Sequence, residues 1–116
     1  MRHLEKGRKF GRIKGRRRSF VSGLVSNLIQ HGRISTTEAR AKEIKPKVEK
    51  LVTVAKKQDL SAMRSLLSKL PKKSAFKMYN EIAPKYADRK GGYTRIVKTA
   101  VIRKRDAARK AIVEFV

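Results

Sequence analysis

The segment DRKGGYTRIVKTA, residues 88–100, decides the fold because the spacing of apolar residues changes within it. Before this segment, apolar residues recur every three or four positions, as in helices that bury one face. From Tyr93 onward the chain alternates as a strand does, and the preceding glycines indicate a turn. This order of patterns predicts helices followed by strands, in an α+β domain. One strand face would carry Thr94, Ile96, Lys98 and Ala100, and the other Tyr93, Arg95, Val97 and Thr99.

A second strand is predicted at the end of the sequence. AIVEFV, residues 111–116, is rich in β-branched residues. Because few residues separate it from the first strand, we expect the two to pair as an antiparallel hairpin. The short segment RIST, residues 33–36, is the expected third strand. The sheet is therefore expected to be small, and either mixed or antiparallel.

Two helices are predicted in the middle of the chain. Asp59 is the expected cap of the first helix, and Pro71 lies just past its end. Ser74 is the expected cap of the second helix, SAFKMYNEIAPKY, which Pro84 is expected to end. The side chains expected to face inward are Leu60, Met63, Leu66, Leu67 and Leu70 in the first helix, and Phe76, Tyr79, Ile82 and Ala83 in the second.

Two longer helices are predicted before them. The earlier one, RRRSFVSGLVSNLIQHG, ends at Gly32, where a left-handed cap belongs. The later one opens with STTE, residues 35–38, which has the spacing of a capping box, and Pro46 is expected to kink it. The expected buried stripes are Phe20, Val21, Leu24, Val25, Leu28 and Ile29 in the earlier helix, and Ala41, Ile44, Val48, Leu51, Val52 and Ala55 in the later one.

The complete prediction is a two-layer α/β fold of the α+β class, in the order α-β-α-α-α-β-β, with the helices packed on the sheet. Residues 1–15 are predicted to form a basic extension that is disordered when free. Three glycines interrupt this extension, and it has few apolar residues to bury. Residues 16–116 are predicted to form one globular domain.

The balance of charge separates the possible classes of function. The 116 residues include 32 Lys and Arg against nine Asp and Glu, for a net charge of +23. Nine of the basic residues and one acid, Glu5, lie within the first 18 residues, and the remainder of the chain is basic too. Solubility needs far less charge. A membrane-surface protein is disfavoured because a core accounts for the apolar helix faces. Nucleic acid is therefore the expected partner.

The sequence contains no recognisable pattern of catalytic or metal-binding residues. Cys is absent, and neither His3 nor His31 has a second metal ligand at a recognisable spacing. His31 is explained by its place near a helix end, where a cation interacts favourably with the helix dipole. The carboxylates are scattered, and no Gly-rich phosphate loop occurs. We therefore expect no catalytic residues, metal, cofactor or small-molecule substrate.

Three basic regions are predicted to bind nucleic acid. Cations of the tail would neutralise phosphates and release counterions. The start of the second long helix adds hydroxyls and N–H groups that attract anions. Cations surround Tyr93, and a basic segment follows at residues 103–105. The candidate residues are Arg2, His3, Lys6, Arg8, Lys9, Arg12, Lys14, Arg16, Arg17 and Arg18 in the first region; Arg33, Thr36, Thr37, Arg40 and Lys42 in the second; Arg89, Lys90, Gly91, Gly92, Tyr93, Thr94, Arg95 and Lys98 in the third, residues 88–98; and Arg103, Lys104 and Arg105 in the basic segment that follows it.

Two of these regions have a second interpretation. The STTE segment is also typical of an ordinary capped helix, and the two roles are compatible. Tyr93 either stacks on an unpaired base or packs in the core beside a tight turn.

Several segments occur in the order seen in a known family. They are MRH with GRKF, HGRISTTEARAKEIK, LVTVAK, EIAPKYADRKGGYTRIVK and the final AIVEFV. Through them, nearly the whole sequence resembles the bacterial-type large-subunit ribosomal protein seventeen family. The combination of GGYTRI with I-x-T-T-x-x-x-A-K is the most specific part. The stretches IKGRRRSF and KRDAARK depart from the family pattern, but both keep the positive charge.

The resemblance implies a two-layer α/β protein without catalysis. It implies binding to large-subunit ribosomal RNA near the exit of the polypeptide tunnel, beside neighbouring ribosomal proteins, in the bacterial cytoplasm or an organelle. Under it, the tail threads into folded RNA and becomes ordered there. The positions that match the family pattern are Arg2, His3, Gly7, Arg8, Arg12, Thr36, Thr37, Lys42, Gly91, Gly92, Tyr93, Thr94 and Arg95.

Two alternatives come from other classes. A nucleoid-type architectural DNA-binding protein would share the charge but would not need an aromatic platform at Tyr93. An enzyme acting on RNA would lose turnover when its carboxylates or histidines are substituted.

Overall fold

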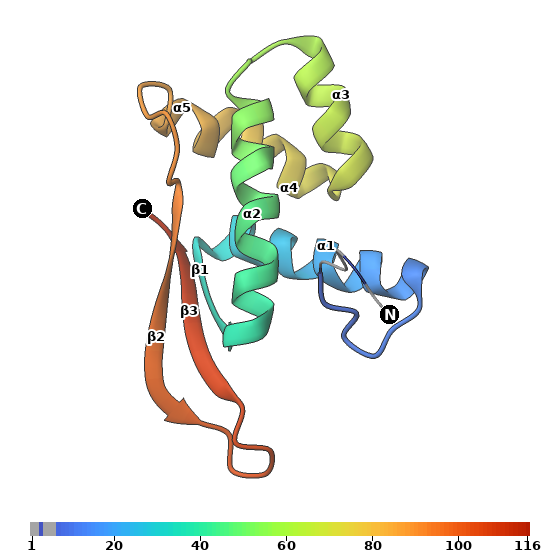
Figure 1. Ribbon diagram of the computed structural model, residues 1–116. Coiled ribbons are helices and arrows are strands. Elements are labelled where there is room, and N and C mark those ends of the chain that lie inside the picture. Colours follow the sequence, from blue (N-terminus) through green and yellow to red (C-terminus); the bar gives the residue numbers. More distant parts are fainter. Residues whose placement is uncertain (1–2, 4–6) are drawn as a thin grey trace.

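The structure is a computed structural model that describes residue 3 and residues 7–116. Its element order agrees with the predicted order, except that the last predicted helix is divided into three short elements (Figure 1). The elements are α1 (Lys14–His31), β1 (Arg33–Thr37), α2 (Glu38–Ala55), α3 (Leu60–Lys69), α4 (Lys72–Lys77), the π-helix η1 (Met78–Ile82), α5 (Ala83–Lys85), β2 (Thr94–Ile102) and β3 (Arg109–Phe115).

The three strands form one antiparallel sheet with the order β1-β3-β2. β2 and β3 form the predicted hairpin, and β1 pairs with the other edge of β3. Val113 lies at the centre of the register, opposite Ile34 on one side and Ile96 on the other. The sheet is therefore purely antiparallel, which decides between the two arrangements that the sequence allowed.

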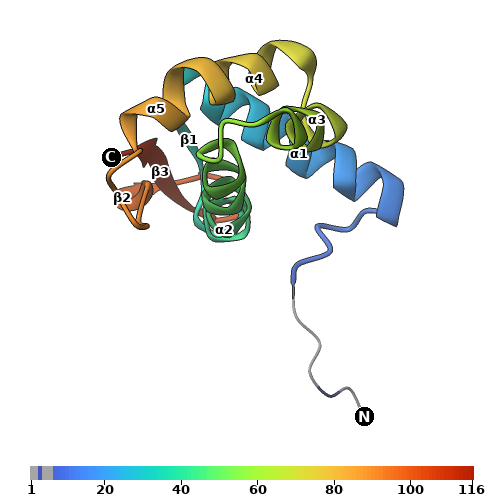
Figure 2. The same ribbon diagram turned by 90° about the horizontal axis from the view of Figure 1, so that it is seen from above.

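The helices cover one face of the sheet and leave the other open (Figure 2). α2 lies next to the sheet, and all six residues predicted for its inner face are buried. It remains one helix across Pro46. Ala111 and Val113 of β3 and Thr94 of β2 are buried on the helical side. The expected two-layer α+β fold is thus confirmed.

α1 begins two residues before the predicted start, at Lys14, and Gly32 ends it with a φ of 76° in the left-handed region, as predicted. Of the predicted stripe, Phe20 and Leu24 are half-buried beside the core, and the others are buried. The side chains buried from α1 are Val21, Val25, Leu28 and Ile29.

The N-terminal cap of α2 differs from the prediction. Ser35 lies within β1, and the capping residue is Thr37, whose Oγ1 accepts a hydrogen bond from the Arg40 N–H at 3.3 Å. The predicted capping box at residues 35–38 is therefore wrong. Pairing with β3 keeps the chain extended through Thr37, so the helix starts two residues later than the local pattern suggested.

The predicted last helix also differs. It begins after Pro71, and Ser74 is buried inside α4 instead of capping it. Pro84 does not end the helix, which continues through α5. Just before Pro84 the turns widen, and the Ala83 N–H bonds to the carbonyl of Met78, five residues back. A wider turn relieves the clash that a proline ring makes with the carbonyl four residues earlier.

Some predicted inward residues lie on the surface instead. Asp59 caps α3 as predicted, through a 2.7 Å bond to the Ala62 N–H, but Leu60 and Leu67 are exposed. Phe76 of α4 is exposed as well. In β2, Thr94 and Ile96 lie on one strand face as predicted, and that face is turned to the core. Beyond Lys98 the hairpin extends past the helices (Figure 1), so alternation no longer separates buried from exposed residues.

Candidate nucleic-acid interface

The first turns of α1 concentrate positive charge at a helix N-terminus. Lys14, Arg16 and Arg18 are exposed and Arg17 is half-buried. Ile13 provides no side-chain cap, and the first turn contains no acidic residue. A helix N-terminus carries partial positive charge and N–H groups without intrahelical partners. Added cations make this end a strong attractor of anions.

The described part of the tail packs against the start of α1. The rings of Phe10 and Phe20 meet edge to face, with centroids 5.5 Å apart. The guanidinium carbon of Arg12 lies 3.8 Å from the Phe20 centroid, and Arg12 also donates to the Phe10 carbonyl at 2.8 Å. Arg40 of α2 approaches the same ring at 4.9 Å. These contacts bring tail, α1 and α2 cations together around one aromatic pair.

A hollow of about 370 Å³ lies between this tail segment, α1 and α2. Glu43 is the one acid among its described lining residues, and it pairs with Arg8 at 3.7 Å. The hollow brings cations of the first predicted region together with Lys47 of α2, which was not predicted, and it fits an anionic group. The cations that line it are Arg8, Lys9, Lys14, Arg17, Arg18 and Lys47.

The start of α2 is less open to an anion than predicted. Thr36 is buried, and the Thr37 hydroxyl is used as the helix cap. Glu38 pairs with Lys42 at 2.8 Å and with Lys98 of β2 at 3.6 Å. The hydrogen bond from Lys42 lowers the pKa of Glu38. Lys42 and Lys98 remain exposed and lie near each other, although they are far apart in sequence.

Tyr93 is buried in the core, with 3% of its surface exposed. Its ring lies 5.3 Å from that of Tyr86, and its hydroxyl bonds to Lys56 Nζ at 3.0 Å and donates to the Arg89 carbonyl at 3.2 Å. Lys56 Nζ also donates to the Arg89 carbonyl. The structure therefore favours the core interpretation of Tyr93, because its buried ring cannot stack on a base.

Glu49 of α2 holds the same segment, and the sequence analysis missed it. Its carboxylate accepts hydrogen bonds from the Tyr93 N–H at 3.0 Å, the Thr94 N–H at 2.9 Å and the Thr94 hydroxyl at 2.8 Å. Burial is the largest influence and raises the pKa of Glu49, but these bonds together outweigh it and lower that pKa overall. One feature of the sequence could have indicated a buried role for Glu49: it follows Val48, at the edge of the apolar stripe of α2.

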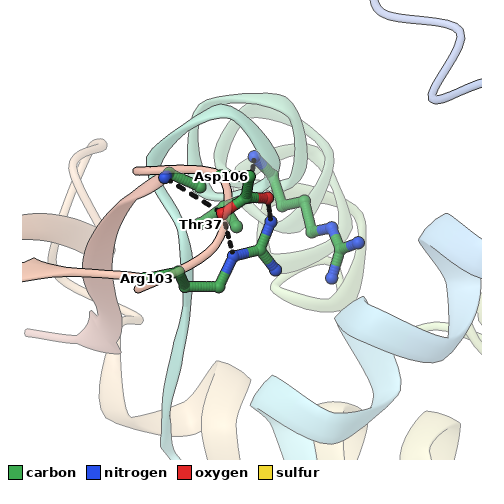
Figure 3. A network of polar contacts seen from close by, with 5 residues as sticks. Thr37, Arg103 and Asp106 are labelled. Atoms are coloured by element: carbon green, nitrogen blue, oxygen red, sulfur yellow. Dashed lines mark hydrogen bonds and ion pairs between the residues drawn. The ribbon is translucent and has the colours of Figure 1, made fainter.

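The loops at the two ends of β2 carry the other cations of the third region and the basic segment at residues 103–105, and they lie far apart (Figure 1). At one end, Lys90 is exposed and Arg89 donates to the Gly91 carbonyl at 3.1 Å. At the other end, Arg103 is paired with Asp106 (Figure 3), with Nε 3.0 Å from Oδ1. Side-chain hydrogen bonding by Arg103 lowers the pKa of Asp106. Lys104 and Arg105 are exposed at the tip.

The open face of the sheet carries two more candidates, Arg33 and Arg95. They flank Glu114, at 3.6 Å and 2.7 Å respectively. The hydrogen bond from Arg95 lowers the pKa of Glu114. His3 is exposed. Arg2 and Lys6 lie outside the described residues.

Metal-binding clusters and membrane-spanning helices are both absent from the described part of the chain. Residue 3 and residues 7–116 contain no cluster of three or more acidic or histidine side chains placed to hold a metal ion. None of the described helices is long and apolar enough to span a bilayer.

Comparison with known proteins gives a consistent result. The model of the family described as ribosomal protein L17 matches residues 20–116. The large ribosomal subunit protein bL17 of Thermodesulfovibrio yellowstonii is 48% identical over all of this chain and 87% of its own length. The proteins of the same name from Sulfurimonas denitrificans and Campylobacter lari are each 47% identical over all of this chain, and over 100% and 99% of their own lengths.

Proposed function

This chain belongs to the ribosomal protein L17 family, and from this premise we propose that it is a structural component of the large ribosomal subunit that binds large-subunit ribosomal RNA. We place it near the exit of the polypeptide tunnel, beside neighbouring ribosomal proteins, within ribosomes of the cytoplasm. Its task is to neutralise phosphates and hold RNA helices in position. This role requires neither catalysis nor a cofactor.

One observation supports the proposal above the others: cations occupy the positions of α1 where a helix disfavours them. Lys14, Arg16, Arg17 and Arg18 lie in the first two turns, and the first turn has no acid to offset them. Positive charge is destabilising next to the positive end of the helix dipole. A bound phosphate backbone converts this repulsion into attraction, because both the side chains and the helix end then face negative charge.

The exposed cations suit recognition of shape and backbone better than recognition of bases. Arg forks two donors onto one phosphate, and Lys acts as a point charge. The aromatic ring that sequence analysis offered for stacking is buried. We therefore propose contacts that are largely to phosphate and ribose, as expected for a protein that binds folded RNA by shape.

The arrangement of the cations divides the proposed interface into parts. The hollow lined by the tail, α1 and α2 forms the centre, and Lys42 and Lys98 extend it toward the hairpin. Lys104 and Arg105 at the tip reach further from the core (Figure 1). Residues 1–15 are proposed to order fully only on RNA, and residues 16–116 to form the domain that carries the interface.

The proposal is tested by sedimentation. A lysate is run on a magnesium-containing sucrose gradient, and the fractions are probed for this protein with and without a moderate salt wash. The expected result is co-migration with the large ribosomal subunit and retention after the wash. Migration at the top of the gradient, or release by a DNA-specific nuclease, would overturn the proposal and support the DNA-binding alternative.

A further inference from the structure

An apolar groove lies between α1, α2 and α3. It adjoins the hollow proposed as the centre of the RNA interface and shares Arg18, Val21 and Lys47 with it. The groove measures about 250 Å³. Val21 and Val25 of α1, Leu51 and Val54 of α2 and Leu70 after α3 form its floor. Ser22 Oγ donates to the Lys69 carbonyl at 3.2 Å and so ties α1 to the end of α3.

The rim of this groove is positively charged. Arg18, Lys47, Lys50 and Lys69 surround the floor and are exposed. Among the described residues that line the groove, none is Asp or Glu. The groove therefore combines an aliphatic floor with a cationic border contributed by three different helices.

We propose that this groove binds a short amphipathic helix of another protein, one with carboxylates on both sides of two large aliphatic residues. Aliphatic side chains in the groove are favoured in proportion to the apolar area that leaves water. Carboxylates beside them meet the four rim cations. Binding of a helix in a groove between helices is a common mode of peptide recognition.

The charge of the groove argues against other occupants. A second copy of this chain also carries a net charge of +23, so its approach to a cationic rim is repulsive. The basic tail is disfavoured for the same reason. An RNA backbone suits the rim cations, of which Arg18 and Lys47 also line the adjoining hollow, but phosphates gain nothing from the aliphatic floor. This inference goes beyond the RNA binding proposed above, because it assigns a protein partner of defined chemistry.

The test uses a fluorescein-labelled helical peptide of about 18 residues, a length that permits some helix formation in water. The peptide has two leucines one turn apart with glutamates on either side. Two control peptides replace the glutamates with lysines, or the two leucines with serines. Binding to the full chain is followed by fluorescence anisotropy. We expect the first peptide alone to bind, and Lys50→Glu to weaken its binding about tenfold, a typical effect of altering one charge pair at an interface.

The matched control is Lys104→Glu, which makes the same change of charge at the hairpin tip. It is expected to leave peptide binding unchanged and to weaken binding of a ribosomal RNA fragment measured in parallel.

Val54→Glu, at a half-buried position of the floor, is expected to abolish peptide binding, with circular dichroism to confirm folding. Binding of the lysine peptide, or equal effects of Lys50→Glu and Lys104→Glu on the acidic peptide, would overturn the inference. If the wild-type chain binds the acidic peptide but not the RNA fragment, the result would count against the proposed function and not against this inference.

Discussion

Glu49 is an acidic side chain whose hydrogen-bond donors all come from one short segment, Tyr93 and Thr94. In a chain with net charge +23, such a carboxylate is costly to place on an RNA-facing surface. Here it fixes the start of β2 onto α2. The GGYT segment, which carries part of the family resemblance, therefore has a structural role through its Tyr and Thr.

Replacing Glu49 by Gln is expected to destabilise the protein by about 1–3 kcal/mol, because one carboxylate oxygen that accepts N–H bonds becomes a donor. Equilibrium unfolding in urea at neutral pH measures this change. Glu81→Gln, at an exposed position of η1, is the matched control and is expected to leave stability nearly unchanged. Equal stabilities of Glu49→Gln and wild type would show that the three bonds contribute nothing.

The same substitution is expected to alter the pH dependence of stability. The pKa of Glu49 is lowered in the folded state from the ordinary value of 4.5. A carboxyl group with a lowered pKa stabilises the fold above its unfolded pKa, and this contribution is lost as the pH falls through the folded pKa. Wild type should therefore lose stability more steeply than Glu49→Gln between about pH 5 and pH 3. Parallel acid-unfolding curves would contradict this.

At the scale of elements, the interior of each long helix was predictable and its ends were less so. The stripe of α2 is wholly buried because its period is set by helix geometry alone. The start of α2 depends on β1, whose pairing with β3 involves residues about 75 positions later, and no local pattern reveals such a pairing. Likewise, Pro84 is tolerated because η1 widens, a change that spacing does not reveal.

The observed and the predicted capping residues of α2, Thr37 and Ser35, can be compared directly by substituting each with alanine. Thr37→Ala is expected to destabilise the protein by about 1 kcal/mol, since the Arg40 N–H loses its side-chain acceptor. Ser35→Ala, which the sequence pattern favoured as the capping position, is expected to have a smaller effect because Ser35 is exposed within β1. Thermal unfolding of the two variants decides between the positions. A larger loss for Ser35→Ala would restore the predicted capping box.

Removing cations from the N-terminus of α1 is expected to have opposite effects on the stability of the free protein and on its binding to RNA. The double variant Lys14→Gln/Arg16→Gln is expected to stabilise the free protein by about 0.3–1 kcal/mol per cation removed, because both side chains oppose the helix dipole. It is expected to weaken binding to a ribosomal RNA fragment and to reduce the log–log salt slope by about 0.9 for each phosphate that the variant no longer neutralises. Urea unfolding and salt-dependent filter binding measure the two effects.

The control for this variant is Lys73→Gln/Lys85→Gln, which removes two exposed cations from α4 and α5. It changes the net charge equally but leaves the start of α1 intact. Equal changes of the salt slope in the two double variants would mean that overall charge, not the start of α1, governs binding.

At the scale of the whole molecule, the sequence indicated a class of partner but not how the candidate cations are grouped in space. Net charge and its spread along the chain indicated nucleic acid without any knowledge of the fold. The fold then separated candidates that are near in sequence, since the loops at the two ends of β2 lie far apart (Figure 1). The fold also brings together candidate residues that are far apart in sequence, such as Lys42 and Lys98, which both pair with Glu38. The spacing of residues along the sequence indicates neither which candidates the fold separates nor which it brings together.

The net charge of +23 also implies that the free protein is destabilised by its own repulsion. Raising sodium chloride from about 0.1 M to 1 M shortens the screening length from about 10 Å to 3 Å. The melting temperature of the free chain should therefore rise, by about 4–8 °C if screening contributes about 1 kcal/mol. Over the same range, RNA binding should weaken, because released counterions are less favourable at high salt.

Differential scanning calorimetry of the free chain and binding to an RNA fragment, measured in the same buffers, test these opposite trends. The Lys14→Gln/Arg16→Gln variant should show a smaller salt-induced rise in melting temperature than wild type, because part of the repulsion has been removed. A melting temperature that stays constant or falls with salt would show that the cations are already balanced within the free fold. The protein would then have no electrostatic strain for RNA to relieve, and the cations at the start of α1 would not explain RNA binding.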